Sequence, residues 1–222
     1  MIETSPAERL RMVKQGIARA AGLARRSPDK VNLIAVSKTQ PAEAVVSMIE
    51  AGHRAFGENR VQEAQAKWPP LREIFPGLNL HLVGTLQSNK AEEAVQLFDC
   101  IHSVDRPSLV TALAKAMAKA DRRPDCFIQV NVGDEPQKGG CVPNELPALV
   151  EACRTAGLPV IGLMCIPPAD LEPAPYFALL AKLARRHHLP ALSMGMSADF
   201  ETAVMAGATH VRVGTNLFGE RS

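Results

Sequence analysis

Aromatic residues and unbalanced charge are both scarce in this sequence. Phe, Trp and Tyr make up 4% of its 222 residues, and 25 basic against 23 acidic side chains leave a net charge of +2. Nucleic-acid-binding surfaces are usually basic and often present rings that stack on bases. Membrane surfaces also attract proteins with an excess of basic charge. We therefore expect neither nucleic acid nor membrane as a partner.

Long apolar runs and paired cysteines are also missing. No stretch reaches the roughly 18 apolar residues of a membrane-spanning helix, and residues 1–16 lack the apolar core of a secretion signal. The cysteines are odd in number, and their spacing fits neither a disulfide framework nor a metal site: Cys100, Cys126, Cys141, Cys153 and Cys165. These absences predict a cytoplasmic protein with free thiols.

Two hydrophobic periodicities alternate along the chain, one typical of strands and one of helices. Short apolar segments predict strands at 31–37, 53–56, 78–83, 100–103, 126–131, 160–164, 191–194 and 210–213. Segments of helical period lie at 6–26, 41–51, 61–74, 89–97, 107–120, 145–156, 173–187 and 199–206. The third of these helices is expected to break or end near Pro69 and Pro70.

This alternation implies parallel strands joined by right-handed crossovers. Eight such units after one extra N-terminal helix are the count of a closed (β/α)8 TIM barrel, an α/β fold. No linker or shift in composition divides the chain, so residues 1–222 are predicted to form a single domain. An open, doubly wound sheet is the alternative.

Polar residues gather where the predicted strands end, which is the face of a barrel that carries active sites. Lys38 follows the first strand, between Ser37 and Thr39. A lysine after a strand is usually solvated. At a barrel mouth, partial burial instead favours a neutral amine, which can attack a carbonyl group and form a Schiff base.

The segments after the seventh and eighth strands are rich in glycine and hydroxyl residues. They read Ser-Met-Gly-Met-Ser (193–197) and Arg-Val-Gly-Thr-Asn (212–216). This pair of loops is a frequent phosphate site in (β/α)8 barrels, because glycines expose backbone N–H groups and hydroxyls add donors. The alternatives are that Ser197 only caps a helix and Gly214 only makes a turn. Together, opposite Lys38, the loops favour a phosphorylated carbonyl ligand.

Arg212 interrupts the apolar eighth strand. A guanidinium group at the end of a barrel strand must find partners or face the cavity. One interpretation is a structural ion pair with Glu58, Asp105 or Glu135. The other is that the guanidinium donates a hydrogen bond to a ring nitrogen of the ligand.

Motifs along nearly the whole chain resemble those of the pyridoxal phosphate homeostasis (pyridoxal phosphate-binding) proteins. They are AVSKTQP (35–41), FGENRVQEAQAK (56–67), HLVGTLQSNK (81–90), IHSVD (101–105), QVNVGDEPQKGG (129–140), GLMCIPP (162–168), LSMGMSADFETAV (192–204) and GATHVRVGTNLFGER (207–221). The chain departs from the common pattern at Arg60 and Leu80, where the family often has aromatic residues.

The resemblance implies a monomeric or weakly associating single-domain barrel similar to the N-terminal domain of alanine racemase, with pyridoxal 5′-phosphate as cofactor. By position, Lys38 matches the Schiff-base lysine, Arg212 the arginine facing the pyridine nitrogen, and Asn59 a polar residue near the cofactor. The phosphate-binding motifs contain Ser193, Ser197, Gly214 and Thr215. The cofactor wall is matched by Met164, Met194 and Met196, for which ordinary core packing is the alternative.

The sequence favours a carrier in intracellular pyridoxal phosphate homeostasis over an enzyme. An arginine beside the pyridine nitrogen disfavours its protonation, and the neutral ring is a weaker electron sink. Alanine racemases add a second domain with a catalytic tyrosine, whereas a single barrel of this length leaves no room for one and the only tyrosine here is Tyr176, in the helix at 173–187. We expect no catalysis, and apo-enzymes as candidate recipients of the cofactor.

Two enzymatic alternatives use the same lysine. One is a small pyridoxal phosphate-dependent amino-acid racemase. The other is an aldolase that forms the Schiff base on Lys38 directly with its substrate, which leaves Arg212 without a role.

Overall fold

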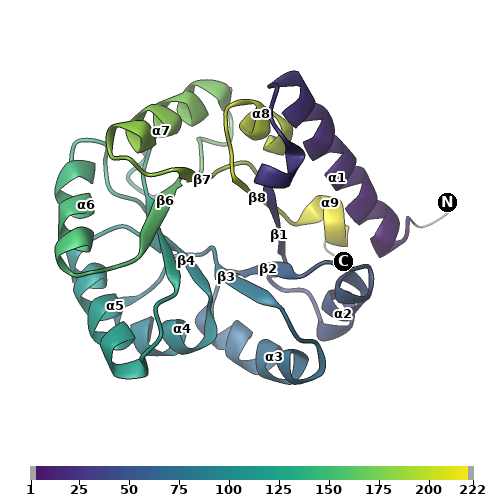
Figure 1. Cartoon of the computed structure of the whole chain (residues 1–222), viewed down its shortest axis with the longest axis horizontal. Helices are drawn as coiled ribbons and strands as arrows, with labels where there is room; N and C mark the ends of the chain where they lie inside the picture. The colour runs from purple at the N-terminus through teal and green to yellow at the C-terminus, as the bar shows by residue number, and fades with distance from the viewer. Residues whose placement is uncertain (1–3, 220–222) are drawn as a thin grey trace.

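Eight short, buried strands form a closed parallel barrel in the order β1 to β8, in a computed structural model that describes residues 4–219 (Figure 1). The strands are β1 (Asn32–Val36), β2 (Ala55–Glu58), β3 (Asn79–Leu82), β4 (Cys100–Val104), β5 (Asp125–Gln129), β6 (Val160–Met164), β7 (Ala191–Ser193) and β8 (His210–Val213). Closure comes from the pairing of β1 with β8, in which Leu33 lies opposite Val211. An open sheet lacks this pairing, so the barrel prediction is confirmed.

The helices form a ring around the barrel, one after each strand, as the chain order predicts (Figure 1). They are α2 (Ala42–Glu50), α3 (Val61–Ile74), α4 (Ala91–Leu97), α5 (Pro107–Ala120), α6 (Leu146–Thr155), α7 (Ala174–Arg186), α8 (Phe200–Met205) and α9 (Thr215–Phe218). Two 3-10 turns, η1 (Pro28–Lys30) and η2 (Ser88–Lys90), precede β1 and α4. Among residues 4–219, no helix is both long and apolar enough to cross a membrane.

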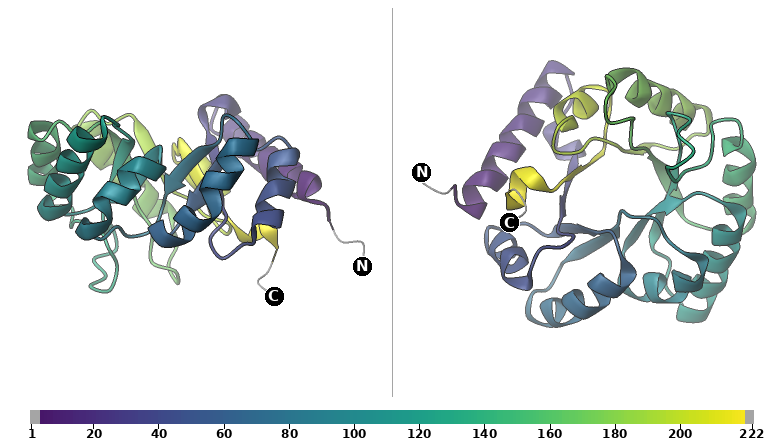
Figure 2. Two further views of the ribbon diagram at one scale, coloured as in Figure 1. Left: turned by 90° about the horizontal axis from the view of Figure 1, so that it is seen from below. Right: turned by 180° about the vertical axis from the view of Figure 1, so that it is seen from behind.

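The predicted extra helix is α1 (Pro6–Leu23), which contacts α2, α8 and α9 on the outside of the barrel (Figures 1 and 2). The hydroxyl of Ser5 caps it by accepting from the Glu8 N–H at 3.2 Å. Its apolar stripe, with Leu10, Val13 and Ile17 buried, recurs at helical spacing and faces the core. Residues before the first strand therefore cover the seam at which the barrel closes.

The prediction that α3 breaks near its prolines is wrong, because the helix continues through Pro69 and Pro70 to Ile74. Both prolines are exposed, so water can solvate the carbonyl groups that lose their N–H partners. Trp68 is fully buried and Leu71 is 5% exposed, which anchors the helix on both sides of the prolines. Packing of these side chains outweighs the local cost of the prolines.

The strand ends lead into loops of unequal length on one side of the barrel. Seen from the side, the loops after β5 and β6 project beyond the other connections (Figure 2). The polar residues buried inside the molecule include Ser37, Glu58, His81, His102, Gln129, Asn131, Ser193 and Arg212. Buried polar groups need hydrogen-bond partners, so this interior is an organised network as well as an apolar core.

Candidate functional site

A cavity of about 340 Å³ lies at the ends of β1, β2, β3, β6, β7 and β8. Its lining comprises Val36, Lys38, Asn59, Val83, Ile166, Met196, Ser197, Ala198, Arg212, Gly214 and Thr215. Residues distant in the sequence are thus brought together at the carboxyl ends of the strands, where (β/α)8 barrels carry their sites. Cavities of about 300 to 1,000 Å³ suit small ligands.

Lys38 is half-buried. The backbone on both sides of it is held by Lys67, which forms an ion pair with Glu58. The Lys67 ammonium donates to the carbonyls of Ser37 and Gln40 at 2.8 and 3.0 Å, on either side of Lys38. It also contacts Oε1 of the fully buried Glu58 at 2.8 Å. The next residue, Thr39, has φ +62°, which is strained for a β-branched residue. The bonds from Lys67 therefore brace a segment that contains a strained residue.

Glu58 connects this loop to the core. Its Oε1 accepts from the Ser37 hydroxyl at 2.8 Å and from the Trp68 indole N–H at 3.1 Å, in addition to Lys67. Three donors on Oε1 offset much of the cost of removing the carboxylate from water, while Oε2 is buried without a hydrogen-bond partner among residues 4–219. Glu58 thus supports the loop that carries Lys38.

Asn59 reaches the cavity because two strand ends approach each other unusually closely. Gly84 follows β3, and a Cβ atom on it would lie 2.2 Å from the Asn59 carbonyl oxygen. Only glycine permits this approach. The contact places Asn59 beside Val83 on the cavity wall.

The loops after β7 and β8 are joined through Ser197. Its hydroxyl oxygen accepts from the Gly214 N–H at 3.2 Å, and its carbonyl accepts from the Asn216 side chain at 3.0 Å. Helix α8 begins at Phe200 with Asp199 as its N-cap residue, so Ser197 is not the cap. The Ser197 O–H hydrogen remains available to a ligand in the cavity, as is the Thr215 side chain on the same wall.

Arg212 lies at the cavity with 4% of its surface exposed. Its Nη1 donates to Ser193 Oγ at 2.6 Å, and its Nη2 donates to the Cys165 carbonyl at 2.9 Å. The carboxylates considered as partners are occupied elsewhere: Glu58 by Lys67, Asp105 by Arg106 and Glu135 by Lys138. Neutral acceptors hold this guanidinium, so its charge is not cancelled by a carboxylate partner.

Six of the nine predicted cofactor-binding residues line the cavity, namely Lys38, Asn59, Ser197, Arg212, Gly214 and Thr215. The other three do not. Met164 packs against Cys100 and Phe127, and Met194 is fully buried in the main core, as the alternative for the methionines had it. The Ser193 hydroxyl is fully buried and taken by Arg212 and His102, so it supports Arg212 from behind. Met196, also predicted as wall, lines the cavity.

Apart from Met196, the apolar residues of the lining were not predicted from the sequence. Val36, Val83, Ile166 and Ala198 carry no chemical signal of their own. Val36 precedes Lys38 by two residues, and in an extended strand such residues share a face. That spacing could have identified Val36; the others depend on how separate strands meet.

Comparisons with known proteins place this arrangement in a family. Residues 13–222 match the family described as alanine racemase, N-terminal domain. The pyridoxal phosphate homeostasis protein of Pseudomonas aeruginosa is 42% identical over 97% of this chain and 95% of its own length. The protein of the same name from Escherichia coli K12 is 40% identical over 97% and 96% of the two chains.

A solved structure of a similar protein has the same fold. PipY of Synechococcus elongatus, determined with pyridoxal phosphate bound, is 43% identical over 91% of this chain and all of its own, with a TM-score of 0.75. The same protein without pyridoxal phosphate superposes with a TM-score of 0.77. The chain belongs to the alanine racemase N-terminal domain family, together with these pyridoxal phosphate homeostasis proteins.

Proposed function

We propose that this protein is a carrier that binds pyridoxal 5′-phosphate in the cavity and holds it reversibly as a Schiff base on Lys38. The observation that carries the proposal is the convergence of three kinds of group on one cavity: the Lys38 amine, two donor-rich loops at Ser197 and Gly214–Thr215, and the Arg212 guanidinium. The names of the relatives and the ligand of PipY support the same cofactor.

The cavity lining fits a phosphorylated aromatic aldehyde. Ser197 and Thr215 offer hydroxyl donors, and no carboxylate is present in the lining, as far as residues 4–219 describe it, to repel a phosphate group. Apolar walls from Val36, Val83 and Ile166 suit a flat ring. A set of donors for an anion beside apolar walls is the usual composition of a small-ligand site.

Different protein groups would bind different parts of the cofactor. When bound, the cofactor supplies an aldehyde for the amine and an electron-accepting ring. Arg212 can donate hydrogen bonds but cannot accept them, so a ring nitrogen facing it is held as an unprotonated acceptor. The Lys38 amine provides the covalent attachment, and the loop hydroxyls bind the phosphate group.

The absence of a second proton-transfer group in the described lining favours a carrier over a racemase. Of residues 4–219, those lining the cavity include no Tyr, His, Cys, Asp or Glu. Tyr176 lies on α7, where it is only partly buried and packs against the hydrophobic core. A racemase needs an acid on one face of the bound group and a base on the other, and Lys38 supplies one such group.

The test is covalent trapping. Purified protein incubated with pyridoxal 5′-phosphate should absorb visible light, and borohydride followed by peptide mapping should fix the adduct to Lys38. Lys38→Ala should lose the adduct, while Lys119→Ala, which removes an exposed lysine paired with Glu92, should keep it. A colourless wild-type protein would contradict the proposal, as would full covalent yield in Lys38→Ala. Sustained racemisation at about 1 per second would establish the enzymatic alternative.

We also propose that the protein works as a cytoplasmic monomer that passes the cofactor to apo-enzymes. Its five cysteines are free and buried, which suits a reducing compartment. The rate at which loaded protein transfers the cofactor to an apo-enzyme should equal or exceed the rate at which free pyridoxal 5′-phosphate loads the same apo-enzyme. Sedimentation should give the mass of one chain.

A further inference from the structure

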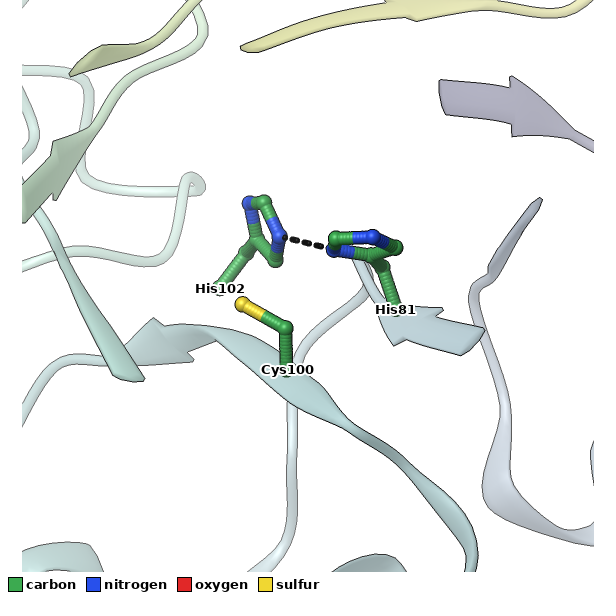
Figure 3. Close-up of side chains that lie close together, drawn as sticks. All are labelled: His81, Cys100 and His102. Atoms are coloured by element: carbon green, nitrogen blue, oxygen red, sulfur yellow. Dashed lines mark hydrogen bonds between the residues drawn. The ribbon is translucent and has the colours of Figure 1, made fainter. Parts of the chain in front are cut away.

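A line of buried polar side chains runs beneath the cavity and across the barrel interior. It starts at Arg212 on β8, passes Ser193 on β7 and His102 on β4, and ends at His81 on β3. Arg212 Nη1 lies 2.6 Å from Ser193 Oγ, which lies 2.8 Å from His102 Nδ1. His102 Nε2 lies 3.0 Å from His81 Nδ1 (Figure 3). None of the four residues is more than 6% exposed.

The chemistry of the donors gives this line one direction. Arg212 only donates, so Ser193 Oγ accepts from it. Ser193 has one hydrogen to give, and the ring of His102 is its other neighbour within hydrogen-bond distance. Ser193 therefore donates to His102 Nδ1, and His102 Nε2–H donates to His81 Nδ1. Ser193 Oγ, both ring nitrogens of His102 and Nδ1 of His81 are thereby all partnered, as buried polar groups require.

Both histidines are neutral in this arrangement. Burial lowers the pKa of His81 to about 3, with a further contribution from His210. Burial also lowers the pKa of His102 well below its usual value, assisted by His81 and then Arg212. A neutral imidazole donates from one nitrogen and accepts at the other, which is what the line uses. Arg212 remains the positive charge of the line.

A metal site is the competing interpretation of the same histidines. Ring nitrogens of His81 and His102 lie within 4.8 Å of Cys100 Sγ and of each other (Figure 3). His81 Nδ1 and His102 Nε2 already share a hydrogen bond, however, and a metal held by that pair of nitrogens would need the lone pairs of both. Burial raises the pKa of the Cys100 thiol well above its usual value, so Cys100 is a neutral thiol beside the hydrogen-bonded histidines. The hydrogen-bonded line accounts for the contacts better.

We propose that Ser193 and His102, backed by His81, are positioning residues that orient the Arg212 guanidinium and thereby set the protonation of the ligand ring nitrogen. The proposal rests on the proposed function and adds residues that do not touch the cavity. The line and the Cys165 carbonyl fix both terminal nitrogens of Arg212. A guanidinium fixed by neutral acceptors keeps its full charge toward the cavity. Without the acceptor nitrogen of His102, no hydrogen bond fixes the orientation of the Ser193 hydroxyl.

The ring nitrogen can be observed directly with pyridoxal 5′-phosphate carrying ¹⁵N in its ring. His102→Phe keeps the ring that stacks on Phe127 at 4.4 Å but removes both nitrogens. We expect it to shift the ¹⁵N resonance and to weaken binding roughly tenfold, because a Ser193 hydroxyl without its acceptor no longer holds its hydrogen bond to the charged Arg212. His102→Asn places an oxygen near the position of Nδ1 and should restore much of the wild-type resonance. Ser193→Ala should act like His102→Phe.

The matched control is His53→Phe, which replaces another buried histidine whose ring nitrogen pairs with the Ala55 carbonyl and whose ring lies against Phe56. It should leave the ¹⁵N resonance unchanged. Unchanged resonances in both His102→Phe and Ser193→Ala would overturn the proposal while leaving the carrier function intact. If His102→Phe does not fold, Ser193→Ala, which removes a single oxygen, decides alone. Failure of wild-type protein to form the Lys38 adduct would instead contradict the proposed function.

Discussion

At the scale of single residues, the buried ion pair of Glu58 and Lys67 does two separable things. It neutralises a fully buried carboxylate, and through Lys67 it holds the carbonyls on both sides of Lys38. Removing one partner of a buried pair leaves an uncompensated charge, which is far more costly than removing both. The stabilising role and the positioning role can therefore be distinguished by substitution.

Lys67→Met should lower the free energy of unfolding by about 3 kcal/mol, because the Glu58 carboxylate is left buried without its cation. In the double variant Glu58→Gln with Lys67→Met no charge is buried, so most of this stability should return. Both variants leave the Ser37 and Gln40 carbonyls without their donor, so both should show reduced adduct on Lys38. Urea unfolding and borohydride trapping measure the two effects. Recovery of adduct together with stability would show that Lys67 does not position the loop.

Residue chemistry made Lys38, Ser197 and Arg212 predictable, because each is an unusual residue at the end of a buried strand. The position of Ser193 was not predictable in the same way. Its hydroxyl bonds to side chains 19 and 91 residues away in the sequence. Which of two serines in one motif faces the cavity depends on how neighbouring strands are rotated, and that rotation is a property of the closed barrel.

At the scale of elements, the loop after β7 depends on Gly195. Its φ is +93°, and a Cβ atom there would lie 2.5 Å from the Ala203 Cβ and 3.0 Å from the Phe200 Cα, both on α8. The residue therefore sets both the direction of the loop and its distance from the helix. Two residues later, Ser197 joins this loop to Gly214.

Gly195→Ala should move the loop and weaken binding of pyridoxal 5′-phosphate at least about tenfold, since a displaced Ser197 loses one hydrogen bond to a charged group. Pyridoxal without the phosphate should be affected less. The free energy of unfolding should fall by about 1 to 3 kcal/mol. Gly22→Ala is the control, because its Cβ meets nothing within 4 Å on the exposed side of α1. Equal losses for pyridoxal and its phosphate would mean that this loop does not bind the phosphate group.

The elements themselves were predicted well where hydrophobic period and length agreed. All eight strands and the helices between them occur in the predicted order. The errors are local. Pro69 and Pro70 do not end α3, because Trp68 and Leu71 anchor it, and the four-residue α9 was missed because one turn has no measurable period. Packing in the first case and shortness in the second override the sequence signal.

At the scale of the whole molecule, closure of the barrel buries or partly buries histidines in or next to several strands. His53 precedes β2, and His81 and His210 lie on β3 and β8. Burial lowers the pKa of His53 to about 4, of His81 to about 3 and of His210 to about 4, with nearby Lys14, Arg54, Arg212 or His210 contributing. In an unfolded chain the pKa of histidine is about 6.5. The folded protein therefore resists protonation that the unfolded chain accepts.

This difference predicts that the free energy of unfolding falls as the pH drops from about 6.5 toward 4, where the unfolded chain binds protons that the folded protein does not. Above pH 7 both states hold neutral histidines, so these groups contribute no slope there. Each group can contribute at most about 1.4 kcal/mol per pH unit. Urea unfolding at pH 7.5, 6.5, 5.5 and 4.5 measures the slope. His53→Gln keeps an N–H donor for the Ala55 carbonyl but cannot titrate. The free energy of unfolding of this variant should therefore change less steeply with pH, by up to about 1.4 kcal/mol per pH unit, the contribution of one titrating group. An equal slope in this variant would show that His53 is protonated alike in both states.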